Sequence, residues 1–340
     1  MKKKIANYLK HILLKRKKKL AEQFLLKVFF LFYPKKFERL KESLGELLSK
    51  RRIAIISPSD SELNLYSRLQ WGDYWVKYEL TKAFGEMGCV VTNESPDVAI
   101  HLFGAPARVA KNTYNIIWIY SHPDMVNAKL LRQYNKIFCL SSFFTQKIRQ
   151  MGFDAEFMIG ATANKPSKRE IKYDVVFVGN TRLMPGGRKI VRDIGETPYN
   201  FKVWGKGWEN ILPEKYYGGR YIDYTRLNEL YSSSLITLND HHKDMSREGF
   251  VAVRIFDILA SGGFCISDKN FGIEEIFGDA VPQYESPKHL KDLIDFYVNH
   301  PDERIKSMEK GRGIALQHIW KKKAKKFLDE VDKSKLGGRK

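Results

Sequence analysis

The residues best suited to chemistry lie between Leu235 and Phe277. Arg254 and Asp257 stand three residues apart in a stretch of helical periodicity, so we expect both side chains on one face of a helix. An arginine can pair with a phosphate group, and a carboxylate can accept hydrogen bonds from ribose hydroxyls. Gly262 and Gly263 follow, and glycines let backbone approach a ligand closely. The alternative is an Arg–Asp pair on a helix surface, followed by an ordinary turn.

Two further residues are candidates for acid–base catalysis. His122 follows an apolar, strand-like run and could act as a base near neutral pH. Asp73 opens a helical stretch after a long loop and could do the same if it faces an acceptor. For each, a structural role is an equal alternative, and for Asp73 that role would be the N-cap of the helix. We expect His101, at a strand position, to be a core histidine.

The sequence His241-His242-x-Asp244 raises the possibility of a metal site. Adjacent histidines point to different sides of most backbones, and no third ligand is evident. We therefore favour loop residues beside a cleft, and we expect neither a bound metal nor another cofactor.

These residues are embedded in an alternating pattern of strands and helices that starts at residue 51. Strands this apolar are typical of a parallel sheet covered by helices on both faces. The polar linker Ala161–Arg169 separates two such sets, so we predict an α/β protein with two Rossmann-like domains facing a cleft. The expected strands are Ile53–Ser57, Val98–Phe103, Ile116–Tyr120, Ile137–Leu140, Glu156–Ile159, Asp174–Val178, Phe201–Val203, Leu235–Leu238 and Phe264–Ser267. The expected helices are Tyr74–Glu86, Ser142–Met151, Tyr224–Ser232, Ala252–Ala260 and His289–Asn299.

The order of several motifs resembles the donor-binding half of the group-1 (GT-B) glycosyltransferases, in particular the CgeB-like branch. A Leu-Asn strand end at Asn239 precedes the Arg254/Asp257 helix and the small-Gly-Gly turn. Tyr173–Asn180 resembles the first strand of that half, and Phe201–Trp208 resembles its strand–Gly–x–Gly–Trp element. Tyr297–Arg304 resembles its late helix. The likeness covers residues 172–330 well and the N-terminal half only in outline.

The resemblance implies a GT-B glycosyltransferase that uses a nucleotide-diphosphate sugar and no metal. Asp257 would hold the donor ribose in place of the usual glutamate, and Arg254 and Arg188 would bind the diphosphate. Glu248 stands nine positions before Asp257 rather than the usual eight, which puts its role as a sugar ligand in doubt. Gly262 and Gly263 would lie against the phosphates, and Gly205 to Trp208 would border the base. The nucleotide-binding set that we predict is Gly179, Asn180, Arg188, Gly205, Lys206, Trp208, Asn239, Glu248, Arg254, Asp257, Gly262 and Gly263.

The net charge of +20 is concentrated at the N-terminus. Residues 1–52 hold 17 Lys or Arg against four Glu, a net of +13, around the apolar run Phe24–Tyr33. Lysine clusters that flank an apolar, aromatic-rich stretch are typical of a helix lying in a membrane interface. The run is too short to span a bilayer. Nucleic-acid binding is disfavoured because an apolar run has no use in contacts with phosphates. A helical arm with a solvated basic face is the other alternative.

We therefore expect a cytoplasmic protein, peripheral on the inner face of the cell membrane. The three cysteines are far apart and show no metal spacing, which favours reduced thiols. The predicted segments are the basic helical arm at 1–52, the acceptor domain at 53–165, the donor domain at 166–317, and a helix crossing back with a basic tail at 318–340. The acceptor would be a glycan or lipid-linked intermediate, as in bacterial cell-surface polysaccharide synthesis. A nucleotide-sugar epimerase and a non-catalytic assembly protein are the alternatives.

Overall fold

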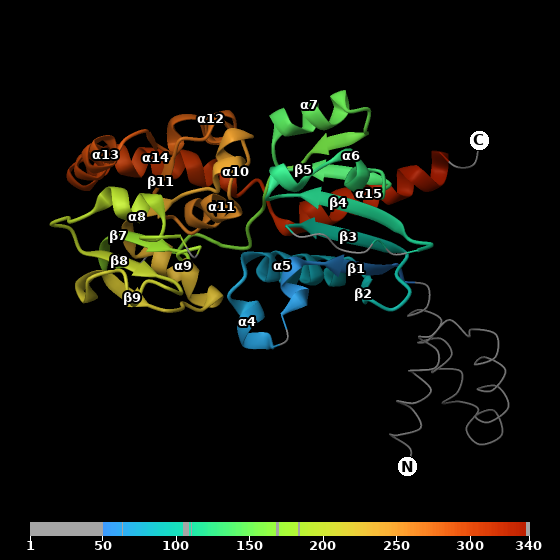
Figure 1. The fold of residues 1–340 in the computed structure, drawn as a ribbon, viewed down its shortest axis with the longest axis horizontal. Helices are drawn as coiled ribbons and strands as arrows, with labels where there is room; N and C mark the ends of the chain where they lie inside the picture. The colour runs from blue at the N-terminus through green and yellow to red at the C-terminus, as the bar shows by residue number, and fades with distance from the viewer. Residues whose placement is uncertain are drawn as a thin grey trace, which may run out of the picture.

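Two parallel α/β units make up the computed structural model of this chain (Figure 1). The structure describes residues 50–62, 64–104, 109, 111–167, 170–182 and 184–337. Over these residues each unit contains a six-stranded sheet, and every pair of neighbouring strands runs parallel. The two Rossmann-like units predicted from the sequence are confirmed. The basic arm lies outside the described residues except for its last three.

The first unit is built on a sheet of order β2-β1-β3-β4-β5-β6. All six residues of its central strand β3 are buried, because helices cover both faces of the sheet. Its strands are β1 (Arg52–Ile56), β2 (Val90–Val91), β3 (Val98–Phe103), β4 (Tyr114–Ile119), β5 (Lys136–Cys139) and β6 (Ala155–Phe157). Its helices are η1 (Pro58–Ser61), α4 (Leu65–Leu69), α5 (Gly72–Glu86), η2 (Pro123–Met125), α6 (Ala128–Leu131) and α7 (Ser142–Gln150).

The second unit has the order β12-β11-β10-β7-β8-β9. Side chains that end the preceding loops cap several of its helices: Asp223, Asn270 and Ser286 each accept a hydrogen bond from a first-turn backbone N–H. Its strands are β7 (Tyr173–Val178), β8 (Phe201–Trp204), β9 (Tyr217–Gly219), β10 (Ser234–Asn239), β11 (Cys265–Asp268) and β12 (Gln283–Tyr284). Its helices are α8 (Lys189–Ile194), η3 (Glu214–Tyr216), α9 (Tyr224–Ser232), α10 (Lys243–Arg247), α11 (Val253–Ala260), α12 (Phe271–Phe277), η4 (Gly278–Ala280), α13 (Pro287–Asn299) and α14 (Pro301–Ala315).

All nine strands expected from the sequence are present, and the structure adds β2, β9 and β12. These three strands have two or three residues each and lie at the edges of the sheets. Segments this short give no apolar run, so sequence periodicity could not have shown them.

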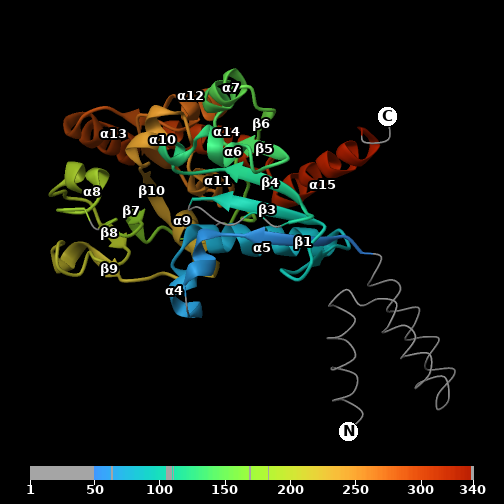
Figure 2. The ribbon, with the colours of Figure 1, turned by 45° about the vertical axis from the view of Figure 1, so that its right-hand side comes forward.

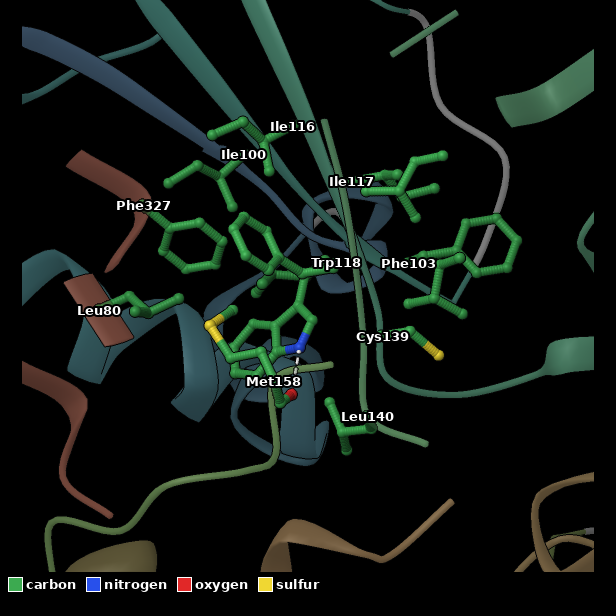
Figure 3. Packing of buried hydrophobic residues seen from close by; sticks show 14 of the residues in the cluster. Leu80, Ile100, Phe103, Ile116, Ile117, Trp118, Cys139, Leu140, Met158 and Phe327 are labelled. Carbon is green, nitrogen blue, oxygen red and sulfur yellow. Dashed lines mark hydrogen bonds between the residues drawn. The ribbon is translucent and has the colours of Figure 1, made fainter. Parts of the chain in front are cut away.

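The last helix, α15 (Trp320–Gly337), packs on the first unit, as the red ribbon in Figure 1 shows. Its fully buried Phe327 ring lies edge-on to Trp118 at a centroid distance of 5.7 Å. Figure 3 shows Phe327 beside Leu80 and Ile100, and Trp118 donating a hydrogen bond from Nε1 to the Met158 carbonyl at 3.1 Å. The C-terminal helix is therefore part of the first unit's core. In the described part of the chain no helix has the length and apolar character needed to cross a membrane.

Candidate functional site

The polar residues of the second unit gather where its parallel strands end. Gly179 follows β7, Gly205 follows β8, Asn239 closes β10 and Asp268 closes β11. Because the strands are parallel, these positions share the carboxyl edge of the sheet, where ligands bind in open α/β folds. Figure 1 shows this sheet beside the first unit, so the edge forms part of the junction between them.

The turns after β7 and β8 depend on glycine. The Gly205 N–H donates to the Gly219 carbonyl at 3.0 Å, and a Cβ at Gly205 would overlap the carbonyl of Gly179. Gly205 has a φ of +149°, which L side chains rarely adopt. Asn180, just beyond, is exposed, and its side-chain oxygen accepts from the Arg182 N–H at 3.1 Å.

The prediction that Trp208 borders a nucleotide base requires correction. Its side chain is fully buried, packs edge-on to Phe177, and donates from Nε1 to the Gly179 carbonyl at 2.7 Å. The indole thus supports the glycine turn from behind. Lys206, in contrast, is exposed at this edge.

Three arginines lie close together at the same edge. Arg188 is buried and donates from Nε to both carboxylate oxygens of Asp240, at 2.7 and 2.9 Å. Arg182 lies 3.9 Å from the same carboxylate and donates to the His241 carbonyl at 2.8 Å. Burial, reinforced by Arg188 nearby, lowers the pKa of Arg182 to about 10. Arg254 contributes in the same sense and makes no hydrogen bond or ion pair with any described residue.

The strand end at Asn239 is a core position rather than an exposed one. Asn239 is fully buried, and its amide donates to Ser267 Oγ at 3.0 Å. Its Oδ1 has no hydrogen-bond partner among the described residues. Asn239 therefore joins the ends of β10 and β11 beneath the arginines.

Asp257 lies one helical turn beyond Arg254 in α11, on the side facing the linker. Thr162 Oγ1 donates to Asp257 Oδ1 at 2.7 Å, and the Asn164 amide donates to the Asp257 carbonyl at 3.2 Å. Burial raises the pKa of Asp257 to about 7, and the neighbouring Glu79 of α5 adds to the increase. Asp257 thus faces both the linker and the first unit.

Gly262 and Gly263 do not lie where the sequence predicts. They follow the C-terminus of α11 and precede β11, so they lie at the amino edge of the sheet, opposite the arginines. Gly262 has a φ of +83° and its N–H donates to the Leu259 carbonyl, an arrangement that ends helices. The glycine pair is a helix-terminating turn, and its expected contact with phosphates is corrected.

Glu248 joins the two units. Lys147 of α7 donates to its carboxylate at 2.7 Å, and Ser141 donates to its carbonyl at 2.5 Å. Glu248 is buried, whereas the Lys147 side chain is 43% exposed. These bonds place Glu248 at the contact between α7 and the loop after α10; Figure 2 shows α7 next to the second unit.

His122 lies across the junction from the arginines. It follows β4 in the left-handed conformation, with a φ of +52°. Its ring contacts that of His242 at a centroid distance of 4.9 Å, and its Nδ1 is 3.9 Å from Asp244 Oδ2. Burial and the nearby Arg182 lower the pKa of His242 to about 4, so this imidazole is neutral at physiological pH. A non-glycine residue in this conformation is uncommon and recurs at functional sites.

Asp73 is buried in the first turn of α5, but it is not the N-cap, which is Trp71. Its Oδ2 accepts hydrogen bonds from the Ser57 hydroxyl and from the Ser59 N–H, the latter at 2.8 Å. Asp73 therefore holds the loop after β1 against α5. His101 is a core histidine whose Nδ1 bonds to the Tyr134 hydroxyl, and burial lowers its pKa to about 4.

The histidines and carboxylates of this edge do not converge on one point. His241 is turned into the protein, where its Nδ1 bonds to Asp268 at 2.6 Å, while His242 faces His122. Within the described residues no group of three or more His, Cys, Asp or Glu side chains has the arrangement of a metal site.

Residues 182–329 match the family model described as glycosyl transferase-like. This range contains the arginine cluster and the whole of α11. The two units together have the GT-B fold, and the second unit resembles the glycosyl transferase-like family. No sequence among the curated proteins matches the chain.

Solved structures resemble this chain over most of its length. The T4 phage β-glucosyltransferase in complex with UDP-glucose has a TM-score of 0.56 at 14% identity, covering 83% of this chain and 98% of that one. Sucrose-phosphate synthase from Thermosynechococcus elongatus has a TM-score of 0.60 at 11% identity, with 85% and 100% covered. AviGT4, a glycosyltransferase of avilamycin A biosynthesis, has a TM-score of 0.52 at 15% identity, with 82% and 96% covered. At these identities the likeness establishes the fold.

Sequence reasoning missed three residues of the arginine cluster: Asp240, Arg182 and His242. The sequence assigns no role to Asp240 or Arg182, and it places His242 in a loop beside a cleft without a role in binding. A signal for Asp240 was present, since a charged residue directly after a buried strand lies at the ligand-binding edge. For Arg182 there was no such signal, because Arg182 itself adopts a left-handed backbone conformation, with a φ of +56°, that its sequence does not indicate.

Proposed function

We propose that this protein is a glycosyltransferase that takes its sugar from a nucleotide-diphosphate donor whose diphosphate binds to Arg182, Arg188 and Arg254. The observation that carries the proposal is the excess of positive charge at the junction of the units. Arg188 and Arg182 share the carboxylate of Asp240, and Arg254 makes no ion pair with any described residue. A diphosphate would supply the missing negative charge and accept several charge-assisted hydrogen bonds.

The start of α11 supports the same location. The helix begins at Val253 on the carboxyl edge, and its N-cap residue Ala252 has no side chain that could cap it. The first N–H groups of such a helix favour a bound anion. Together with the guanidinium groups they could stabilise the charge that develops on the departing diphosphate, so that the reaction needs no metal.

Asp257 remains our proposed ligand for the donor ribose. It lies on the helix that carries Arg254, and its Oδ1 already accepts a hydroxyl hydrogen bond from Thr162. A ribose hydroxyl would take the place of that donor or use the second oxygen. We expect Asp257→Ala to weaken donor binding by about 1–3 kcal/mol, as for loss of a buried hydrogen-bonding group.

For the catalytic base we propose His122. It is half-buried, comes from the first unit, and faces the arginine-bearing unit across the junction. Asp244 is close enough to orient its ring when the site closes around substrates. Asp73 is the weaker candidate because Ser57 and Ser59 occupy one of its carboxylate oxygens.

We further propose a membrane-associated acceptor, a glycan or lipid-linked intermediate, with the protein peripheral on the inner face of the membrane. The support is the net charge of +13 in residues 1–52 around the apolar run Phe24–Tyr33. Deleting residues 1–50 should give a folded protein that no longer sediments with anionic liposomes. Retained sedimentation would refute the role of the arm.

The donor site is tested by thermal shift with UDP, GDP, CMP, ADP and TDP, because a ligand that binds only the native state raises its melting temperature. We expect one diphosphate family to stabilise the wild type. Arg254→Met should weaken binding of that ligand roughly 10- to 100-fold, the worth of a hydrogen bond to a charged group. The exposed Arg226 of α9 provides the matched control, Arg226→Met, which should bind normally. Equal affinity in the two variants would overturn the assignment of Arg254.

A further inference from the structure

A buried histidine lies beneath the arginine cluster. His241 follows β10 directly, and none of its side chain is exposed. Its imidazole is enclosed by the protein, whereas the ring of its neighbour His242 meets that of His122. The proposed function gives His241 no part in binding or chemistry.

Both ring nitrogens of His241 are bonded, which fixes its tautomer. The backbone N–H of Ala252 points at Nε2 at 3.0 Å, and an N–H can only donate, so Nε2 is the acceptor. Nδ1 must then carry the proton and donate it to Asp268 Oδ1, 2.6 Å away.

Four hydrogen bonds join His241 to three separate segments. Asp268 ends β11, and its Oδ2 also accepts from the His241 N–H at 3.0 Å. Ala252 is the N-cap of α11, whose second residue is Arg254. The carbonyl of His241 accepts from Arg182 at 2.8 Å. His241 therefore contacts both Arg182 and the start of the helix that bears Arg254. These are the two arginines that form no close ion pair with Asp240.

We propose that His241 is a positioning residue that anchors the start of α11 and the Arg182 side chain, so that Arg182 and Arg254 are held at the separation a diphosphate requires. The inference takes its ligand, a diphosphate, from the proposed function, whereas the anchoring of α11 and Arg182 by His241 does not depend on that function. The imidazole accepts from the backbone N–H of the N-cap residue Ala252, the group that a first-turn Glu or Gln bonds in a capping box. The Asp268 carboxylate keeps the ring oriented, as carboxylates commonly do for functional histidines.

The test compares His241→Ala with His241→Gln, whose amide oxygen can reach the position of Nε2. Hydrogen exchange in peptides covering Phe250–Arg254 should be faster in His241→Ala and slowed again in His241→Gln. The affinity for whichever of UDP, GDP, ADP or TDP stabilises the wild type should fall roughly 10-fold in His241→Ala, the effect of losing one hydrogen bond, and recover in His241→Gln. His101→Ala provides the control, because it removes a buried imidazole from the other sheet and should leave both readings unchanged.

The possible outcomes distinguish the anchoring of α11 by His241 from its role in diphosphate binding. Unchanged exchange at α11 in a folded His241→Ala would overturn the anchoring. Faster exchange with wild-type affinity would overturn the positioning role and leave His241 as a stabilising cap. If the wild type binds none of the diphosphates, the proposed function fails, and exchange alone decides whether His241 anchors α11. If His241→Ala does not fold, the same comparison is made with Asp268→Asn, which frees the ring but keeps the imidazole.

Discussion

Replacing Asp257 by asparagine should make the protein more stable at high pH and leave it unchanged at low pH. Asparagine keeps an oxygen for the Thr162 hydroxyl, which donates to Asp257 at 2.7 Å in the wild type. It also places an N–H group where a protonated carboxyl would carry its proton. The substitution therefore removes the ionisation and little else.

The sign follows from the raised pKa, about 7 in the folded protein against 3.8 for an ordinary aspartate. Below about pH 4 both states hold the proton, and Asp257 does not affect stability. Between pH 4 and 7 the unfolded chain releases its proton while the folded protein keeps it, so stability falls by up to about 1.4 kcal/mol per pH unit. Above pH 7 both states are ionised, and the full loss persists.

The expected gain for Asp257→Asn at pH 8 is therefore at most about 4 kcal/mol, for a shift of some three units. Because the residue is half-buried, solvent reduces this figure, and we expect about 2 kcal/mol. Glu79 adds to the shift through its charge, so Glu79→Gln should move the transition to lower pH.

Urea denaturation at pH 5, 6, 7 and 8 measures the effect as the difference between variant and wild type, which cancels the ionisation of all other groups. Asp292→Asn is the control, because this exposed aspartate pairs with Lys288 on the same helix and should give a nearly constant difference. A constant difference for Asp257→Asn as well, or one that shrinks as the pH rises, would refute the assignment of a raised pKa to Asp257.

Three further changes test other features of the structure. Asp240→Asn leaves the buried Arg188 without its ionised partner and should lower the free energy of unfolding in urea by about 3–5 kcal/mol. Adding Arg188→Met to this variant should recover most of that stability, and additive losses in the double variant would contradict the pairing. Phe327→Ala should cost about 3–5 kcal/mol by opening a cavity between α15 and the first sheet, and a loss below 1 kcal/mol would show that α15 does not complete that core. Gly205→Ala should lower both stability and donor affinity, because its Cβ would overlap the carbonyl of Gly179, and normal thermal shifts with the donor nucleotide would contradict a role for this turn.

Much of the fold follows from the sequence because parallel strands buried on both faces leave unmistakable apolar runs. Strands such as Val98–Phe103 are apolar at nearly every position, and the structure buries the whole of β3. The short edge strands β2, β9 and β12 left no such signal, since pairing with a neighbour, rather than burial, defines them. The linker was visible as a polar interruption between two such series.

The candidate site, like the fold, was predictable from the sequence only in part. The sequence by itself determined that Arg254 and Asp257 share a helix, because their spacing is a property of local geometry. Only the tertiary structure decided what each side chain meets: Arg188 is paired with Asp240 by strands more than 50 residues apart, and Trp208 is turned into the core. It also decided that Gly262 and Gly263 end α11 at the far edge of the sheet. A residue's type and spacing fix its chemistry and its helix face, but its partners come from strand order and from the packing of the two units, which no local pattern encodes.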